Sequence, residues 1–276
     1  MSRQLIRPGD VLLSQYLVER VLGSGGMGFV VAVKTTQTHQ RFAIKVMLPN
    51  GAHHPEVERR FLREARACMR LKGQHTTRVH DVGQLEDGSW FMLMEHLDGM
   101  DLKAYLAQRG PLPPTEALEF VRQACVGLSE AHEIGIIHRD IKPGNIMVER
   151  RIDGTLKPYI MDFGLAKEVE EKGKTVTGAI LGTPAYMSPE QAQGDVHTMD
   201  RRSDVYSLGA TLYSLIASRP PFVAEHPWKL LLLVAFEDAP VLSKVQKGVP
   251  ADLDTIVMKC LEKDRNRRYL TANGLA

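Results

Sequence analysis

The pattern of apolar residues changes near residue 97, and this change limits the folds that the chain can adopt. Up to that point, short β-like runs at 17–22, 30–35 and 41–47 are broken by glycines, and one helical pattern covers 55–71. Two further runs, 78–84 and 90–95, flank Glu86-Asp87-Gly88, which is a hairpin signal. Beyond Gly99 helical spacing dominates, with helices predicted from Thr115, over 203–218 and over 251–262. We therefore expect an α+β fold with a β-rich small lobe, containing one key helix, and a mostly α-helical large lobe.

Composition excludes several classes of protein. The 276 residues are 43% hydrophobic, which is enough to bury a substantial core. The 35 basic and 33 acidic residues nearly cancel and form no basic stripe, so no nucleic-acid partner is expected. The N-terminus has no signal-peptide pattern, and no apolar run is long enough to span a membrane. We expect a cytoplasmic protein whose three widely spaced cysteines, Cys68, Cys125 and Cys260, are buried as small apolar residues.

A glycine-rich string lies between the first two predicted strands. Residues 22–30 read LGSGGMGFV, which places Gly23, Gly25 and Gly28 in a G-x-G-x-x-G-x-V pattern. Glycines let backbone N–H groups approach phosphate oxygens without a Cβ in the way. The pattern alone also fits an ordinary turn. A strand follows the glycines, and not the helix of a dinucleotide site, so a phosphate-binding hairpin is favoured.

A lysine and a glutamate form the next candidate pair. Lys45 ends the apolar run 42–45, where a lysine extending to the surface is the simpler alternative. Glu64 falls on the apolar face of the helix predicted at 55–71, beside Phe61 and Cys68. A carboxylate on a buried face is costly unless it is paired. Lys45 is its natural partner.

Two short strings in the large lobe carry most of the chemistry. Residues 138–145 read HRDIKPGN and supply the acid Asp140, the cation Lys142 and the amide Asn145. Residues 162–164 read DFG and add a second carboxylate, Asp162. Carboxylate and amide oxygens together with phosphates are the ligands that Mg²⁺ prefers. This combination suits phosphoryl transfer.

These strings, in this order, resemble the eukaryotic-type (Hanks-type) serine/threonine protein kinases, most closely the bacterial ones. The loop HRDxKPxN and the segment 182–190, GTPAYMSPE, are motifs typical of serine/threonine kinases rather than tyrosine kinases. The resemblance covers about residues 15–272. It implies one protein kinase domain over 1–276, with a small lobe and hinge at 16–97 and a large lobe at 98–276. It also implies transfer of the ATP γ-phosphoryl group to Ser/Thr hydroxyls of proteins, in bacterial signalling.

The resemblance assigns catalytic roles residue by residue. Asp140 would accept the hydroxyl proton, and Lys142 would neutralise the transferred phosphoryl group. Asn145 and Asp162 would bind Mg²⁺, or Mn²⁺ in its place. Lys45, held by Glu64, would align the ATP phosphates. For structural roles, His138 would pack and hydrogen-bond, Asp204 would hold the backbone of the catalytic loop, and Glu190 would pair with Arg268.

The resemblance also implies an ATP pocket. Met94 would lie beside the adenine, Glu95 and Leu97 would offer backbone groups to its edge, and Asp101 would face the ribose. Apolar side chains would enclose the ring. The full set of predicted nucleotide-binding residues is Leu22, Gly23, Gly25, Gly28, Val30, Ala43, Lys45, Met94, Glu95, Leu97, Asp101 and Met147.

Regulation is expected in the segment between Asp162 and Glu190. In the family, the arginine at the position of Arg139 pairs with a phosphorylated residue of this segment. Thr175 or Thr177 would be the autophosphorylated residue, so that the protein is a phosphoprotein, and Thr183 would bond Asp140 and Lys142. A plain solvated loop is the alternative for this charged stretch.

Two other functions share the predicted fold. A pseudokinase, an ATP-binding scaffold module, usually lacks the equivalents of Lys45, Asp140 or Asp162, and this chain has all three. A small-molecule phosphotransferase would lack the segment 183–190. Some bacterial receptor-type members dimerise through the small lobe, so the resemblance makes such a homodimer a partner to test. The chain stops within the expected last helix of the large lobe, so a longer, membrane-anchored parent stays open.

Overall fold

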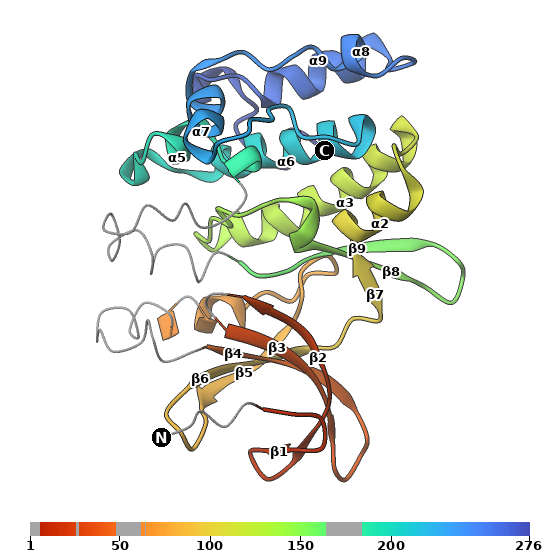
Figure 1. Cartoon of the computed structure of the whole chain (residues 1–276), viewed down its shortest axis with the longest axis vertical. Coiled ribbons are helices and arrows are strands. Elements are labelled where there is room, and N and C mark those ends of the chain that lie inside the picture. Colours follow the sequence, from red (N-terminus) through yellow and green to blue (C-terminus); the bar gives the residue numbers. More distant parts are fainter. Residues whose placement is uncertain (1–5, 26–27, 48–61, 64, 164–183) are drawn as a thin grey trace. The chain divides into compact units, whose positions relative to one another are not determined.

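The computed structural model describes residues 6–25, 28–47, 62–63, 65–163 and 184–276, which form two compact units (Figure 1). The small unit takes in the chain up to residue 72 together with 77–97. The large unit takes in 73–76 and, of the described residues, 98–163 and 184–276. Among the described residues, no helix is both long enough and apolar enough to cross a membrane.

The small unit is built on one antiparallel sheet. Its strands are β1 (Val11–Leu12), β2 (Tyr16–Gly25), β3 (Gly28–Thr35), β4 (Arg41–Met47), β5 (Val79–Gln84) and β6 (Trp90–Glu95), in the order β1-β2-β3-β4-β6-β5. Alternate apolar residues of β3, β4 and β6 meet in a core around Val31, Ile44 and Leu93. The strands predicted from sequence are confirmed, and so is the turn at Gly88, whose φ is 80°. The helix predicted at 55–71 is helical at 62–63 and 65–68 within the described residues.

The large unit combines a small sheet with helices. Strands β7 (Gly99–Asp101), β8 (Ile146–Arg150) and β9 (Leu156–Ile160) form an antiparallel sheet that packs against α2 (Leu102–Arg109) and α3 (Pro114–Glu133). The further α-helices are α5 (Pro189–Ala192), α6 (Arg201–Ala217), α7 (Pro227–Phe236), α8 (Leu242–Val245) and α9 (Ala251–Cys260). Short 3-10 turns η2 to η5 cover Pro143–Asn145, Pro184–Tyr186, Val196–Thr198 and Arg265–Arg267.

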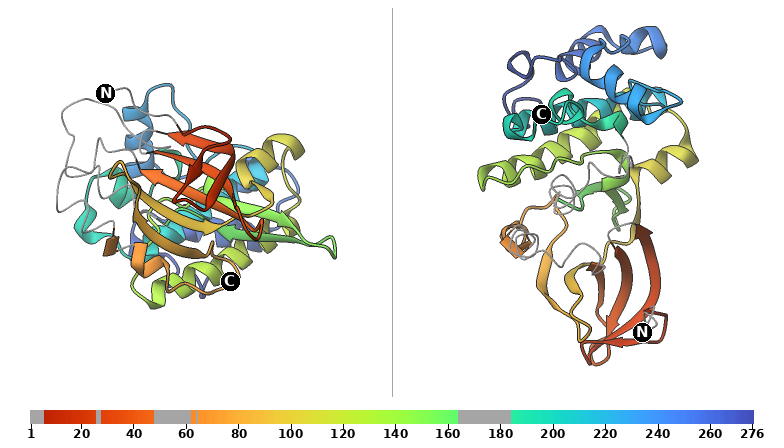
Figure 2. Two further views of the ribbon diagram at one scale, coloured as in Figure 1. Left: turned by 90° about the horizontal axis from the view of Figure 1, so that it is seen from below. Right: turned by 60° about the vertical axis from the view of Figure 1, so that its left-hand side comes forward.

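Helix α6 is the centre of this unit. Every residue from Ser203 to Ile216 is buried, and α3 and α9 pack against it (Figure 2). Gly209 permits the close approach of α9, because a Cβ there would collide with the Cβ of Cys260. The predicted burial of all three cysteines is confirmed, and burial raises the pKa of Cys125 to about 12. The long central helices are therefore rigid elements from which loops can be positioned.

Candidate active site

The loop 138–145 brings together two predicted catalytic residues, Asp140 and Lys142, and the predicted metal ligand Asn145. Lys142 Nζ donates to Asp140 Oδ2 at 2.8 Å, and Asn145 Nδ2 donates to the same oxygen at 2.9 Å and to the Asp140 carbonyl at 2.8 Å. The Asp140 and Lys142 side chains are 21% and 22% exposed, so both are reachable from solvent. The side chains are thus held in one orientation by charge-assisted hydrogen bonds before any substrate arrives.

A buried carboxylate from α6 holds this loop. Asp204 Oδ1 accepts from the Arg139 N–H at 2.8 Å. Its Oδ2 accepts from the His138 N–H at 2.8 Å and from His132 Nε2 at 2.8 Å. Asp204 has no exposed surface, so these three donors replace the water that its charge would otherwise need. The structural role predicted for Asp204 is confirmed.

His138 links the loop to the segment before Asp162. Its Nε2 donates to the Met161 carbonyl at 2.8 Å, so its Nδ1 is the acceptor for the Asp140 N–H at 3.2 Å. Burial, the largest influence, lowers the pKa of His138, although Asp204 and Met161 act in the other direction. The ring also lies 4.8 Å from that of Phe163, between centroids. His138 is therefore a neutral packing and hydrogen-bonding residue, as predicted.

The small sheet brings the two predicted metal ligands to one end. Asn145 directly precedes β8 and Asp162 follows β9, and the antiparallel register pairs Ile146 with Ile160. The Met161 N–H also donates to the Asn145 carbonyl at 2.9 Å. The Asn145 side chain uses its amide nitrogen toward Asp140, which leaves its oxygen for a cation. One amide and one carboxylate oxygen fit Mg²⁺, which completes its shell with phosphate and water.

Two residues of this region have left-handed backbones that favour glycine. Arg139 has φ 63° and Asp162 has φ 54°. Such conformations cost on the order of 1 kcal/mol or more for residues with side chains, and they concentrate at functional sites. Here the Asp204 and Met161 contacts hold the segments that contain them. The fold therefore stabilises a loop geometry that the local sequence disfavours.

A buried ion pair supports the loop from the segment 184–192. Arg268 Nη1 and Nη2 donate to the two Glu190 carboxylate oxygens, each at 2.9 Å, which confirms the predicted pair. Burial would raise the pKa of Glu190, but the hydrogen bonds and charge of Arg268, with the Ser203 hydroxyl, outweigh it and lower that pKa. The neighbouring Gln191 Nε2 donates to the Arg139 carbonyl at 2.8 Å.

Gln191 is a positioning residue that we did not predict from the sequence. The sequence feature that could have drawn attention to Gln191 is the capping box Ser188-x-x-Gln191 at the start of α5. Ser188 Oγ accepts from the Gln191 N–H at 3.4 Å, and Gln191 Oε1 accepts from the Ser188 N–H at 3.1 Å. A capping box predicts the helix start. It does not reveal that the same amide reaches the loop.

The small unit holds most of the predicted nucleotide-binding residues. Gly23, Gly25 and Gly28 lie in the β2–β3 hairpin, and a Cβ on Gly28 would collide with the Val46 carbonyl of β4. On the strands, Val30 pairs with Lys45 and Ala43 pairs with Met94. Leu22, also on β2, is 42% exposed. Glu95 ends β6, where its side chain accepts from the Arg78 N–H, and Leu97 follows.

The remaining predicted residues lie in the large unit or outside the described residues. Asp101 pairs with Met147 across β7 and β8, and its carboxylate caps α2 by accepting from the Ala104 N–H at 2.8 Å. The predictions for Glu64, Thr175, Thr177 and Thr183 fall outside the described residues.

Comparison with known proteins decides the family. The model of the family described as "protein kinase domain" matches residues 16–275. The chain belongs to this family. The predicted kinase fold is confirmed by the crystal structure of the Mycobacterium tuberculosis PknI kinase domain, which has a TM-score of 0.77 and 28% identity. That match covers 98% of this chain and 96% of the PknI chain.

Curated kinases support the predicted serine/threonine class. The kinase domain is 38% identical over 266 residues to the serine/threonine-protein kinase PknB of Mycobacterium tuberculosis. It is 34% identical over 267 residues to the serine/threonine-protein kinase PrkC of Bacillus subtilis. These matches cover 95% and 97% of this chain but 42% and 40% of the relatives, so the chain spans about two fifths of their length. Kinases of this family use ATP and a divalent metal ion.

Replacing Asp204 by asparagine tests how far the kinase domain depends on its anchor. The carboxamide has the same shape but offers one acceptor oxygen to three donors. We expect the free energy of unfolding to fall by about 1–3 kcal/mol and kcat to fall by about ten- to a hundredfold. Denaturant unfolding and initial-rate kinetics measure the two effects. The exposed Asp195→Asn variant is the control, and equal kcat in both variants would contradict the anchoring role.

Proposed function

We propose that this chain transfers the γ-phosphoryl group of ATP to serine or threonine hydroxyls of proteins. Residues 16–97 and 98–276 would act as the small and large lobes of a single kinase domain. The observation that carries the proposal is the convergence of Lys142 and Asn145 on the Asp140 carboxylate, with Asp162 brought to the same end of the small sheet. The relatives named serine/threonine-protein kinases support it.

The large-unit residues would carry the chemical step. The acceptor hydroxyl oxygen forms a bond to the γ-phosphorus, the bond from the γ-phosphorus to the β–γ bridging oxygen breaks, and ADP leaves. The hydroxyl proton passes to Asp140, and Lys142 stabilises the negative charge on the transferring group. Asn145 and Asp162 would hold Mg²⁺ or Mn²⁺, which neutralises phosphate charge when bound. Arg139 would pair with a phosphorylated Thr175 or Thr177, and Thr183 would bond Asp140 and Lys142.

The small-unit residues would bind and orient ATP. The glycine hairpin would offer backbone N–H groups to the phosphates, and Lys45, paired with Glu64, would contact them as a cation. Ala43 and Met94 pair across β4 and β6, and together with Leu22 and Val30 they would form the apolar wall against adenine. Glu95 and Leu97 would meet the adenine edge through their backbones. Met147 would pack on the ring, and Asp101 would face the ribose.

The proposal is tested with radiolabelled ATP. The chain is incubated with [γ-³²P]ATP, Mg²⁺ and a basic acceptor protein, and the acid-hydrolysed products are separated. We expect labelled phosphoserine or phosphothreonine and no phosphotyrosine. Binding of ATP without transfer would contradict the proposal and favour a scaffold module. Gel filtration of the same preparation, with and without ATP, tests the homodimer that the family resemblance suggests.

Autophosphorylation is tested by phosphopeptide mapping. After incubation with ATP and Mg²⁺ we expect phosphate on Thr175 or Thr177. The guanidinium of Arg139, the residue before Asp140, would pair with this doubly charged phosphate group and stabilise it. Valine at both positions is expected to remove that phosphopeptide and to lower activity toward an added substrate. An active preparation in which neither threonine is modified would contradict this mode of control.

A further inference from the structure

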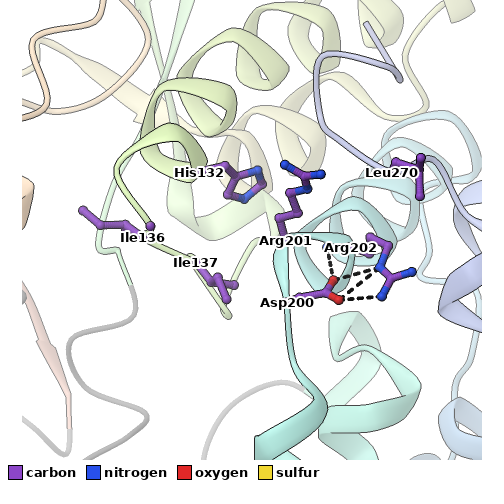
Figure 3. A pocket seen from close by; sticks show the side chains of 8 residues that line it. His132, Ile136, Ile137, Asp200, Arg201, Arg202 and Leu270 are labelled. Carbon is purple, nitrogen blue, oxygen red and sulfur yellow. Dashed lines mark hydrogen bonds and ion pairs between the residues drawn. The ribbon is translucent and has the colours of Figure 1, made fainter.

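A pocket of about 330 Å³ lies in the large unit, apart from all of the predicted kinase site residues (Figure 3). It is formed where α3 ends and α6 begins, and Leu270 of the C-terminal segment also lines it. Its volume is at the lower end of the range of small-molecule sites. The chemistry of its lining residues indicates what would bind there.

One lining residue carries an unsatisfied buried nitrogen. The His132 side chain is 5% exposed, and its Nε2 lies 2.8 Å from Asp204 Oδ2. A carboxylate only accepts, so Nε2 is the donor, and in the Nε2–H tautomer of imidazole the other ring nitrogen, Nδ1, is an acceptor. Among the described residues, Nδ1 has no hydrogen-bond partner. A buried polar atom without a partner is costly, so an occupant that donates to Nδ1 would gain that missing bond.

A cation lies on the rim of the same pocket. Asp200 and Arg202 also line the pocket, but their charges are paired with each other, because Arg202 Nη2 lies 2.6 Å from Asp200 Oδ2. Within the described part of the chain, the Arg201 side chain has no ion pair or hydrogen bond, and the residue is exposed. Its charge is therefore available for an anionic group of an occupant.

The walls between these polar groups are apolar. Ile136 and Ile137 are half-buried, and Leu270 is 63% exposed. All three residues line the pocket together with His132 and Arg201, and Figure 3 labels them. Apolar surface of this kind binds the body of a ligand, and the few polar groups fix its orientation.

We propose that this pocket is a regulatory site for a small amphipathic acid that carries a hydroxyl or N–H donor. Its apolar body lies against Ile136, Ile137 and Leu270, its carboxylate pairs with Arg201, and its donor bonds Nδ1 of His132. A donor at Nδ1 polarises the imidazole and strengthens the bond from Nε2 to Asp204. Asp204 holds the backbone of His138 and Arg139, so the ligand acts on the catalytic loop. This regulatory effect rests on the proposed kinase function.

Binding is tested by calorimetry with 6-hydroxy-2-naphthoate as the probe. The acid 2-naphthoate lacks the hydroxyl donor, and 2-naphthol lacks the carboxylate. We expect loss of either group to weaken binding about fivefold to tenfold, since each removes one directed hydrogen bond or ion pair. In Arg201→Gln, 6-hydroxy-2-naphthoate and 2-naphthol should bind alike. The control Arg219→Gln removes another exposed arginine of the large unit and should keep the wild-type preference.

Initial rates of acceptor phosphorylation test the regulatory effect. Saturating 6-hydroxy-2-naphthoate is expected to raise kcat at least threefold in the wild type and in Arg219→Gln, and not in Arg201→Gln. No binding to the wild type, or binding that Arg201→Gln leaves unchanged, would overturn the site. Binding without a rise in kcat would overturn its regulatory role. If the wild type binds the probe but phosphorylates nothing, the proposed kinase function is contradicted, whereas the binding site itself is supported.

Discussion

Replacing Asp140 by asparagine is expected to lower the rate of phosphoryl transfer by about a hundredfold or more. The variant keeps the shape of the side chain and one acceptor oxygen for Asn145. It removes the negative charge that fixes Lys142 Nζ at 2.8 Å, and a carboxamide takes no proton at neutral pH. Both losses act on the chemical step. Single-turnover transfer from [γ-³²P]ATP measures it.

The control for this prediction is Asp252→Asn, which removes a carboxylate from an exposed position on α9. The melting temperatures of the two variants should be close, because the Asp140 side chain is only partly buried. Lys45→Met, in the other compact unit, removes the cation that we propose to contact the ATP phosphates, and it is expected to cause a loss of similar size. Equal labelling by the wild type, Asp140→Asn and Lys45→Met would overturn the mechanism.

Arg268→Met is expected to lower the free energy of unfolding by about 3–5 kcal/mol, because it leaves the Glu190 carboxylate buried without its cation. The Arg268 side chain has no exposed surface, and that of Glu190 is 9% exposed. Among the described residues, only the Ser203 hydroxyl, 2.6 Å from Glu190 Oε1, would remain as a side-chain donor. Denaturant unfolding at pH 7 measures the change.

Two further variants separate the ion pair from simple packing. In Glu190→Met with Arg268→Met no charge is left buried, so most of the lost stability should return. Arg122→Met breaks the exposed pair with Glu119, where solvent screens both charges, and should lower the free energy of unfolding far less than Arg268→Met does. If the double variant were no more stable than Arg268→Met alone, the unpaired charge would not be the cause.

The pH dependence of this prediction follows from the lowered pKa of Glu190. In the wild type the folded-state pKa lies below the unfolded value, so the stabilisation is present above the unfolded pKa and is lost as pH falls through the folded one. In Arg268→Met the Arg268 charge and hydrogen bonds no longer lower the pKa of Glu190, so burial of the carboxyl raises it. The difference in stability between the two proteins should therefore be largest near neutral pH and should narrow in acid.

The sequence predicted those parts of the structure that depend on local patterns or on residues at fixed places in motifs. The period-2 runs predicted the strands of the small unit, and the acid of the segment 202–209 predicted the anchor Asp204. Arg268 was predicted as the partner of Glu190 from the family motif, although the two residues are far apart in the chain.

Contacts that depend on tertiary geometry could not be predicted. The Gln191 amide reaches the Arg139 carbonyl only because α5 is placed beside the loop. His132 follows the helical pattern of α3, and nothing in that pattern shows that one ring nitrogen bonds Asp204 while the other lines a pocket. The α2 cap formed by Asp101 was also missed, since the resemblance assigned that carboxylate to the ribose.

The burial of α6 ties the stability of the large unit to its chemistry. The helix that carries Asp204 is enclosed from Ser203 to Ile216, so any repacking around Gly209 or Leu212 shifts the same rigid body that anchors the loop. Core substitutions far from Asp140 would then lower turnover while the protein is still folded. Selecting variants for thermal stability alone would therefore also change kinase activity. Substitutions along α6 should be tolerated less well than expected from the distance between this helix and the reacting atoms.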